Sequence, residues 1–436
     1  MTITVSSGPG ALDVTRGERA VVAGIERMGQ GNGRSAEARL EEAVGLAQAI
    51  GIDVVARRTF RLRSLAPATL LGKGQVEEIG GIAKAERAGL LIVDAPLTPV
   101  QQKSLEEQSG TKVIDRTSLI LEIFGERAAT AEGRLQVELA HLDYQAGRLV
   151  RSWTHLERQR GGFGFLGGPG ETQIEADRRM IRDRMARIRR ELDQVKRTRG
   201  LHRGRRQRAP WPVIALVGYT NAGKSTLFNR MTGGDVLAED MLFATLDPTM
   251  RDVRLPGFDK AILSDTVGFV SDLPTQLVAA FRATLEEVVS ADLLVHVRDM
   301  AHPDREAQRE DVEQVLMQLG AGRDDAAAPP LLEAWNKVDL LPRQEREALL
   351  TETERREDVV PISALTGFGI DTLRERIADI LHRGAQLHEI ELPAGDGGRI
   401  AWLHARGDVI GQQTRESQVH LQVRLSPENW ARFQSL

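Results

Sequence analysis

The segment 212–230, PVIALVGYTNAGKSTLFNR, has the residue types and spacing of a phosphate-binding loop. Gly218, Gly223, Lys224 and Ser225 fit G-x-x-x-x-G-K-[ST], and the apolar run before them predicts a buried strand. In such a loop backbone amides bind phosphate oxygens, the lysine reaches the β- and γ-phosphates, and the hydroxyl binds Mg²⁺. We expect the nucleotide to be held by Gly218, Tyr219, Thr220, Asn221, Ala222, Gly223, Lys224, Ser225 and Thr226.

A second pair of motifs selects the base. PPLLEAWNKVD predicts a strand that ends in Asn336, Lys337 and Asp339. The Asp339 carboxylate can accept hydrogen bonds from guanine N1–H and its exocyclic amine, whereas adenine presents an acceptor at N1. Rejection of a base that leaves buried polar groups unpaired reaches ~10⁴-fold or more. The backbone of Ser363 and Ala364, in DVVPISAL, can contact the guanine oxygen. The predicted ligands are therefore GTP and GDP.

Further groups serve the third phosphate and a metal ion. KAILSD predicts a strand ending in Asp265, and Gly268 completes the spacing D-x-x-G. The Asp265 carboxylate can hold a magnesium shell, and the Gly268 backbone N–H can respond to the γ-phosphate. A threonine of DMLFATLDPTMRDV completes the shell, and we prefer Thr245 to Thr249. The predicted Mg²⁺ ligands are Ser225, Thr245 and Asp265. The predicted catalytic groups are Lys224, Thr245 and Gly268.

Phe269 stands directly after Gly268, where a glutamine would orient the attacking water. A phenylalanine ring cannot hydrogen-bond that water. We therefore expect slow intrinsic hydrolysis, with the water positioned by another group or by a partner. Simple packing of the ring is the alternative, and the sequence leaves both open.

The segment GGFGFLGGPGET (161–172) also contains G-x-G-x-x-G, but it lacks the setting of a dinucleotide site. The residues before it are charged and predict no buried strand. Apolar residues at helical spacing flank it instead: Leu135, Leu139, Leu142, Ala146 and Leu149 before it, and Ile174, Ile181, Met185, Ile188, Leu192 and Val195 after it. This pattern predicts an antiparallel helical hairpin with the glycines at its tip. Phe163 and Phe165 at the tip offer stacking surfaces for RNA bases.

Charge is distributed unevenly along the chain. The net charge of 436 residues is -4, yet the stretch 178–208 contains 14 Lys or Arg against three Asp or Glu. Arginine predominates there, and its planar fork suits phosphate, so we prefer a nucleic-acid contact to a merely solvated helix face. The absence of cysteine excludes disulfides, thiolate zinc sites and cysteine nucleophiles. No apolar run has the length of a membrane span, and we expect a cytoplasmic protein.

The order of predicted elements indicates an α/β fold class with several domains. The predicted elements of the first part are strands at 19–25, 53–60, 89–94 and 111–116 and helices at 36–50, 74–88 and 99–110. The nucleotide motifs each follow a predicted strand, as on a doubly wound sheet. We predict an N-terminal α/β domain (1–128), a helical hairpin with a Gly-rich tip and basic linker (129–208), a P-loop GTPase G domain with a Ras-like, mostly parallel sheet (209–386) and a small C-terminal α+β domain (387–436).

Beyond the guanine motifs, five segments resemble the HflX family of ribosome-associated GTPases from about Arg19 to the C-terminus. They are LLGKGQVEEI, VDAPLTPVQQKSLEE, GGPGETQIEADRR, LFATLDPT and DTVGF. The resemblance implies a hairpin that enters the large (50S) ribosomal subunit and contacts its rRNA. It also implies GTP hydrolysis on ribosome contact and splitting of stalled 70S ribosomes under stress. A GTPase in ribosome assembly or RNA modification, and a GTP-gated docking protein for a non-RNA partner, are the alternatives. We expect a monomer.

Overall fold

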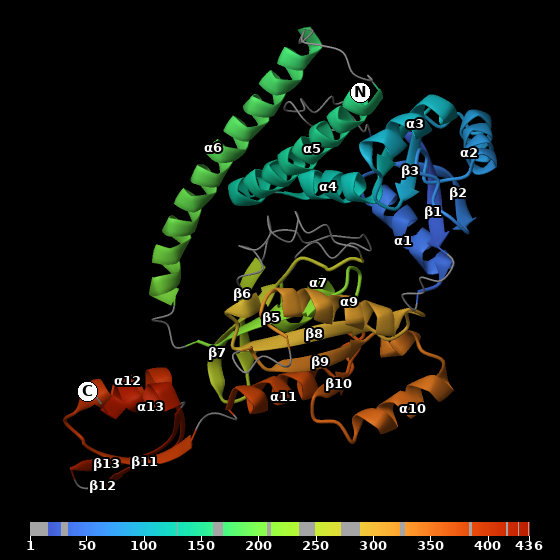
Figure 1. The fold of residues 1–436 in the computed structure, drawn as a ribbon. Coiled ribbons are helices and arrows are strands. Elements are labelled where there is room, and N and C mark those ends of the chain that lie inside the picture. Colours follow the sequence, from blue (N-terminus) through green and yellow to red (C-terminus); the bar gives the residue numbers. More distant parts are fainter. Residues whose placement is uncertain are drawn as a thin grey trace.

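The computed structural model describes residues 16–27, 34–128, 130–159, 169–206, 211–234, 249–271, 288–322, 328–382, 386–415, 417–425, 427–434 and 436. A four-stranded sheet, a long helical hairpin, a six-stranded sheet and a three-stranded sheet follow one another along the chain (Figure 1). The predicted α/β fold class is therefore confirmed. None of the helices in the described ranges is both long and apolar enough to cross a membrane.

The N-terminal unit is a parallel sheet between two layers of helices. Its elements are β1 (Arg19–Arg27), α1 (Ala36–Ala49), β2 (Asp53–Leu62), α2 (Lys73–Ala85), β3 (Leu90–Asp94), α3 (Pro99–Ser109), β4 (Lys112–Asp115) and α4 (Arg116–Arg127). The strand order is β2-β1-β3-β4. Alternate side chains of the strands pack on α1 and α4 at one face and on α2 and α3 at the other. The seven elements predicted in this part are confirmed.

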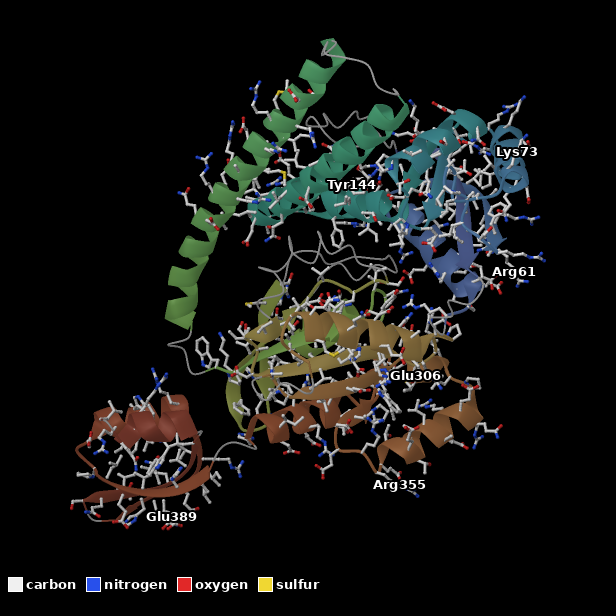
Figure 2. The ribbon with its side chains drawn as sticks, in the orientation of Figure 1. Arg61, Lys73, Tyr144, Glu306, Arg355 and Glu389 are labelled. Atoms are coloured by element: carbon white, nitrogen blue, oxygen red, sulfur yellow. The ribbon has the colours of Figure 1, made fainter. Side chains whose placement is uncertain are left out.

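The sequence did not predict the helix α4. Its twelve residues begin where Asp115 caps the first turn by accepting hydrogen bonds from the backbone and hydroxyl of Ser118. More than half of its residues are buried. The segment 119–124, LILEIF, is a short, nearly continuous apolar run, and periodicity alone cannot assign such a run to a helix or a strand. The helix after it contacts the same aspartate, because the Tyr144 hydroxyl (Figure 2) donates to Asp115 Oδ1 at 2.8 Å.

The predicted hairpin consists of α5 (Ala131–Gln159) and α6 (Pro169–Arg206). The predicted seam is present, because a small apolar cluster joins Leu142 of α5 to Met185, Ile188 and Leu192 of α6. Beside it the guanidinium of Arg184 donates to both carboxylate oxygens of Glu138 at 2.7 and 2.8 Å. The predicted tip, with Phe163 and Phe165, lies outside the described residues.

We expect Ile188→Ala to loosen the hairpin selectively. Ile188 is fully buried, and truncating such a side chain costs about 2–5 kcal/mol, since a cavity replaces packed methyl groups. Hydrogen exchange followed by mass spectrometry should show faster exchange in α5 and α6 and unchanged exchange in the sheets. The control is Arg187→Ala, an exposed neighbour on the same helix. Equal exchange rates in the two variants would contradict the seam.

The G domain is a mostly parallel sheet with strand order β10-β9-β8-β5-β7-β6. Its elements are β5 (Val213–Gly218), α7 (Lys224–Thr232), β6 (Thr249–Leu255), β7 (Phe258–Asp265), β8 (Leu293–Asp299), α9 (Arg305–Gln318), β9 (Leu331–Asn336), a 3₁₀ turn η1 (Val338–Leu340), α10 (Arg343–Thr353), β10 (Val359–Pro361) and α11 (Ile370–His382). Only the edge strand β6 is antiparallel among the described strands of this sheet. The helices α7 and α11 cover one face and α9 the other.

The N-terminal unit and the G domain share one apolar core. Buried residues of α1 and α4 belong to the same apolar cluster as residues of α9 and of the G-domain sheet face that α9 covers. Tyr219, Phe269 and Val270 are members of this cluster from the G domain. The loops after β5 and β7 therefore lie against the N-terminal unit, which stands above them in Figure 1.

The C-terminal unit is α+β, as predicted. Its elements are β11 (Gln386–Pro393), α12 (Gly397–Arg406), β12 (Asp408–Arg415), β13 (Gln418–Leu425) and α13 (Pro427–Gln434). The strands form an antiparallel sheet of order β11-β13-β12. The alternation in HLQVRL places Leu421, Val423 and Leu425 in the core of this unit, against residues of α12 and α13.

Candidate functional site

The phosphate loop joins β5 to α7 and depends on glycine at both of its ends. Gly218 has φ 150°, and a Cβ on it would lie 2.3 Å from the Val297 carbonyl oxygen of the neighbouring strand β8. Gly223 has φ 93°, and a Cβ there would lie 2.3 Å from Asn336 Nδ2. Side chains are thus excluded at these positions by contacts with β8 and with the guanine motif. The loop is therefore built against both neighbours.

Lys224 lies at the start of α7 and reaches back over the loop. Its Nζ donates to the carbonyl oxygens of Gly218 at 3.1 Å and Tyr219 at 2.8 Å. Burial lowers the pKa of Lys224 to about 8, although the negative charge of Asp265 works against this shift. Two carbonyl groups hold the ammonium in place, and its third N–H is left to meet a phosphate oxygen.

The residues predicted to hold Mg²⁺ meet only in part within the described structure. The Ser225 hydroxyl donates to Asp265 Oδ2 at 2.7 Å, and Asp265 is fully buried at the end of β7. Hydroxyl and carboxylate oxygens are ligands that Mg²⁺ prefers, so this pair fits the ion. Thr245 lies outside the described residues. Thr249, the alternative, opens β6 and pairs with Asp265 in the sheet register.

One side chain, that of Asn336 at the end of β9, connects the two guanine motifs and the phosphate loop by hydrogen bonds. Its Nδ2 donates to the Ala222 carbonyl oxygen at 2.8 Å, and its Oδ1 accepts from the Ala364 backbone N–H at 2.9 Å. A single amide thus links the phosphate loop to Ser363 and Ala364, which follow β10. The Ala364 amide is the group that we predicted to contact the guanine oxygen, and in this structure it is bonded to Asn336.

Lys337 and Asp339 continue from Asn336 into η1. Lys337 has φ 63°, and its Nζ forms an ion pair with Asp299 Oδ2 at 2.7 Å. Asp299 ends the neighbouring strand β8, so the ion pair fixes the direction in which the chain leaves β9. Asp339 is partly exposed at the same edge of the sheet. The predicted binding residues that the structure describes therefore all lie along the carboxyl ends of β5, β7, β9 and β10.

The segment after β7 packs directly on the phosphate loop. Phe269 N–H donates to the Gly218 carbonyl at 3.1 Å, and Thr220 N–H donates to the Phe269 carbonyl at 2.7 Å. The Phe269 ring is 2% exposed and belongs to the core shared with the N-terminal unit. The ring is therefore a packing residue in this structure. Slow hydrolysis for lack of a glutamine stays a prediction.

The sequence analysis missed a group of charged residues beside the phosphate loop. Arg34, Glu42, Asp94 and Arg116 belong to the N-terminal unit, and they contact Tyr219, directly or through one another. Their positions in the sequence lie more than a hundred residues before Tyr219, and none belongs to a nucleotide motif. No local pattern could have indicated this contact.

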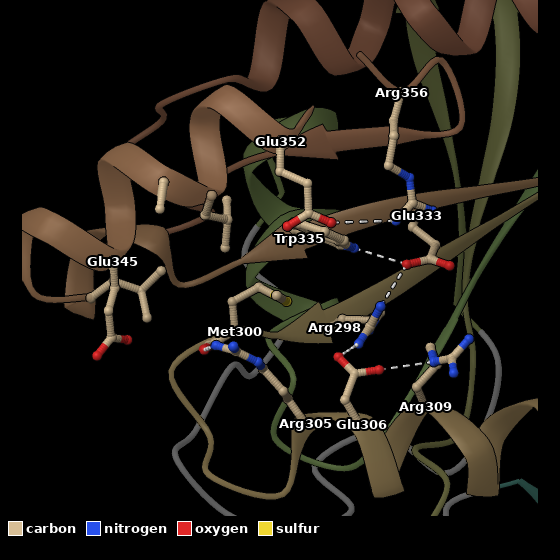
Figure 3. A pocket seen from close by; sticks show the side chains of 13 residues that line it. Arg298, Met300, Arg305, Glu306, Arg309, Glu333, Trp335, Glu345, Glu352 and Arg356 are labelled. Atoms are coloured by element: carbon tan, nitrogen blue, oxygen red, sulfur yellow. Dashed lines mark hydrogen bonds and ion pairs between the residues drawn. The ribbon is translucent and has the colours of Figure 1, made fainter. Parts of the chain in front are cut away.

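A separate polar pocket of about 510 Å³ lies between α9 and α10 (Figure 3). Arg298 at its base is buried and donates to Glu333 at 2.8 Å and Glu306 at 2.7 Å. The remaining charges are Arg305, Arg309, Arg356, Glu345 and Glu352, so acidic and basic groups balance. None of the predicted nucleotide residues lines this pocket. It is not the guanine site.

Four known families match consecutive parts of the chain. Residues 37–125 match the GTP-binding GTPase N-terminal family, and residues 127–206 match the GTP-binding GTPase Middle Region. Residues 213–337 match the 50S ribosome-binding GTPase family, and residues 348–434 match the HflX C-terminal domain.

Similar proteins and structures cover most of the chain. The GTPase HflX of Magnetococcus marinus is 48% identical over 395 residues, which cover 91% of this chain and 90% of that protein. The GTPase HflX of Escherichia coli is 42% identical over 400 residues, covering 90% and 91%. The crystal structure of a GTP-binding protein from Sulfolobus solfataricus in complex with GDP is 23% identical, with a TM-score of 0.44, and covers 84% of this chain and 98% of that one. The phosphate loop and the guanine motifs agree with the four family matches and with the two HflX proteins: the chain belongs to the HflX family of GTPases and is a GTP hydrolase.

Proposed function

We propose that this GTPase binds the large (50S) ribosomal subunit through its helical hairpin and splits stalled 70S ribosomes under stress. The observation that carries the proposal is the basic surface of α6. Within the side chains that are described on this helix, Arg179, Arg182, Arg187, Arg189 and Arg190 are exposed. They stand on the outer side of a helix whose other side is fixed to α5 by the apolar seam.

The chemistry of this surface favours an RNA partner. Arginine presents a planar fork that matches phosphate geometry, and phosphate contacts supply most sequence-independent affinity for nucleic acid. The family matched by residues 213–337 is named for binding the 50S ribosome, which supports the same partner. Ribosomes work in the cytoplasm, so the proposed function places the protein there, and we propose that it acts as a monomer.

The G domain would control this binding through the γ-phosphate. We propose that Ser225, Asp265 and Thr245 hold Mg²⁺, which would neutralise charge on the phosphates, while Lys224 and the Gly268 amide contact them. A ligand shifts a balance only by its differential affinity for two states. GTP would favour the state that fits the ribosome, and loss of the γ-phosphate on hydrolysis would release the protein. The predicted division at residues 128, 208 and 386 separates the parts with these roles.

We expect neutralisation of the arginines on α6 to weaken binding to the large subunit. The triple variant Arg182→Gln, Arg187→Gln and Arg189→Gln loses three expected phosphate contacts. The negative slope of log affinity against log salt should therefore become shallower by about 2–3. Sedimentation with purified large subunits at several salt concentrations measures this.

The matched control is a second triple variant, with its three Arg→Gln substitutions on the N-terminal unit instead of the hairpin. Arg57, Arg58 and Arg61 of β2 are exposed, and each forms an ion pair with a glutamate. Their replacement by Gln should leave the salt slope unchanged. If the two triple variants bind equally well, or if binding of the unaltered protein does not weaken with salt, the hairpin docks on protein instead of RNA.

A second experiment separates splitting from other ribosomal roles. We expect GTP turnover to rise with purified 50S and 70S particles, and 70S particles to dissociate into subunits in the presence of GTP. Light scattering follows the dissociation. Stimulated turnover without dissociation would favour a role in ribosome assembly over splitting.

A further inference from the structure

The loop between β10 and α11 (Figure 1) is braced by hydrogen bonds within itself. The N–H of Ser363 donates to the Phe368 carbonyl oxygen at 2.9 Å. The carbonyl oxygen of Ser363 accepts from the Gly367 N–H at 2.8 Å, and its hydroxyl accepts from the Thr366 N–H at 3.1 Å. The N–H of Phe368 donates to the Thr366 hydroxyl at 3.4 Å. These bonds hold residues 363–368 as one compact turn.

Two further N–H groups of this loop, those of Ala364 and Leu365, differ in what they meet. The Ala364 N–H donates to Asn336 Oδ1 at 2.9 Å and is therefore already used within the protein. In the range 363–368, where every residue is described, only the Leu365 N–H has no acceptor among the described residues. The Leu365 side chain is 71% exposed, so this part of the loop is open to a ligand.

Arg230 of α7 fixes the peptide group to which the Leu365 N–H belongs. Its Nε donates to the Ala364 carbonyl oxygen at 3.1 Å, and its Nη2 donates to the Leu365 carbonyl oxygen. In a planar trans peptide the carbonyl oxygen and the following N–H point in opposite directions. Because the Ala364 oxygen is directed at the guanidinium, the Leu365 N–H points away from Arg230.

The charge of Arg230 also makes the Leu365 N–H a stronger donor. A hydrogen bond from a cation to a carbonyl oxygen polarises the amide, and linked hydrogen bonds strengthen one another. Within the described residues Arg230 forms no ion pair, and its hydrogen-bond partners are the two carbonyl oxygens of this loop. Its interactions are therefore concentrated on the peptide group that carries the unused donor.

The unused donor lies beside the carboxylate that we predict to recognise guanine. The N–H of Val338 donates to the Ile362 carbonyl oxygen at 3.4 Å, which joins η1 to the start of this loop. Asp339 follows Val338 directly. On the edge of guanine, the oxygen O6 stands next to N1–H, so a base bound by Asp339 presents an acceptor beside that contact. Adenine carries an amine, a donor, in the place of O6.

We infer that Arg230 is a positioning residue for guanine recognition: it orients and polarises the Leu365 N–H, which donates to O6 of the base. Asp339 then accepts from the two donors of the guanine edge, and Leu365 donates to its acceptor. The sequence indicated the backbone of Ser363 and Ala364 for this oxygen, but the N–H groups of both are used within the protein. The inference rests on the predicted recognition of guanine by Asp339 and not on ribosome binding.

The test compares GDP with 6-thioguanosine diphosphate, in which sulfur, a larger and weaker acceptor, replaces O6 and the other groups of the base are kept. We expect the unaltered protein to prefer GDP by about tenfold. Arg230→Ala should lose about tenfold in affinity for GDP, while affinity for the thio analogue changes by less than about twofold. Arg230→Lys should keep part of the preference, because an ammonium can still donate to one carbonyl oxygen. Calorimetric titration of the full chain at neutral pH measures both affinities.

Arg374→Ala is the matched control for loss of an arginine that bonds to a backbone carbonyl. Arg374 of α11 donates to the Met231 carbonyl oxygen of α7 at 3.3 Å, a bond that does not involve the loop, so the ratio of the two affinities should stay unchanged. An unchanged affinity for the thio analogue shows that a variant is folded, and Arg230→Lys decides if Arg230→Ala does not fold.

Three results would overturn the inference. Equal losses for both ligands in Arg230→Ala would mean that the arginine only stabilises the fold, and no loss for either would mean that it does not act on the base. If the unaltered protein binds both diphosphates equally well, the loop does not recognise O6. The inference then fails even where Asp339→Asn still exchanges guanine for xanthine.

Discussion

Asp339→Asn should convert the site from a guanine to a xanthine binder, with affinity for GDP falling by up to about 10⁴-fold. We expect the Asp339 carboxylate, at the carboxyl end of β9, to accept hydrogen bonds from guanine N1–H and the exocyclic amine. In the variant an amide N–H faces these two donors, so the base cannot be paired. Xanthine carries a carbonyl oxygen in place of the amine and can accept from the new amide. Titration with GDP and xanthosine diphosphate gives the two affinities.

The matched control is Asp371→Asn at the start of α11. This carboxylate is 92% exposed, so the same chemical change there should leave both affinities as they are. Asn336 already fixes the geometry of the loop through its bonds to Ala222 and Ala364. The Asp339 variant should therefore keep its fold. If Asp339→Asn keeps its preference for GDP, Asp339 does not read the base.

Lys224→Ala should abolish GTP turnover, by about 10³-fold or more, because a preorganised positive charge at the phosphates is removed. The ammonium is held over the phosphate loop by the carbonyl oxygens of Gly218 and Tyr219. Single-turnover hydrolysis with saturating protein separates this loss from weakened binding. Turnover should remain absent when ribosomal particles are added.

Lys73→Ala provides the control for removal of a lysine. Lys73 opens α2, and its side chain is 87% exposed, so its loss removes one positive charge without touching the site. We expect unchanged turnover for this variant. Substantial hydrolysis by Lys224→Ala would mean that the loop after β5 does not carry the reaction, whatever the partner of the hairpin.

Local sequence patterns were sufficient to predict those features that are formed by residues close together in the sequence. The phosphate loop needs only a strand, two glycines with their lysine, and a helix start, and all of these lie between Val213 and Thr232. The guanine motifs each follow one strand, and parallel strands bring their carboxyl ends to one edge. The hairpin seam repeats along two helices, so its period is visible in the sequence. These predictions of fold and placement agree with the structure.

Contacts between segments that are distant in the sequence could not be predicted from such local patterns. The apolar run of helix α4, 119–124, is too short and too continuous to be assigned to a helix by periodicity, and its burial against the first sheet and α5 is decided by packing. The hydrogen bonds from Glu42 to Tyr219 and from Glu42 and Arg116 to Ser271 join residues 155 to 229 positions apart. They form only when the N-terminal unit packs on the G domain. The sequence left the role of Phe269 open between slow hydrolysis and simple packing, and the structure places its ring in the core shared by the two units. The sequence of this protein thus specifies where the predicted nucleotide-binding groups lie, since their placement is set by local chain geometry. Packing between the units specifies which charged side chains lie beside the phosphate loop, since charge pairing and burial depend on segments that only the folded chain brings together.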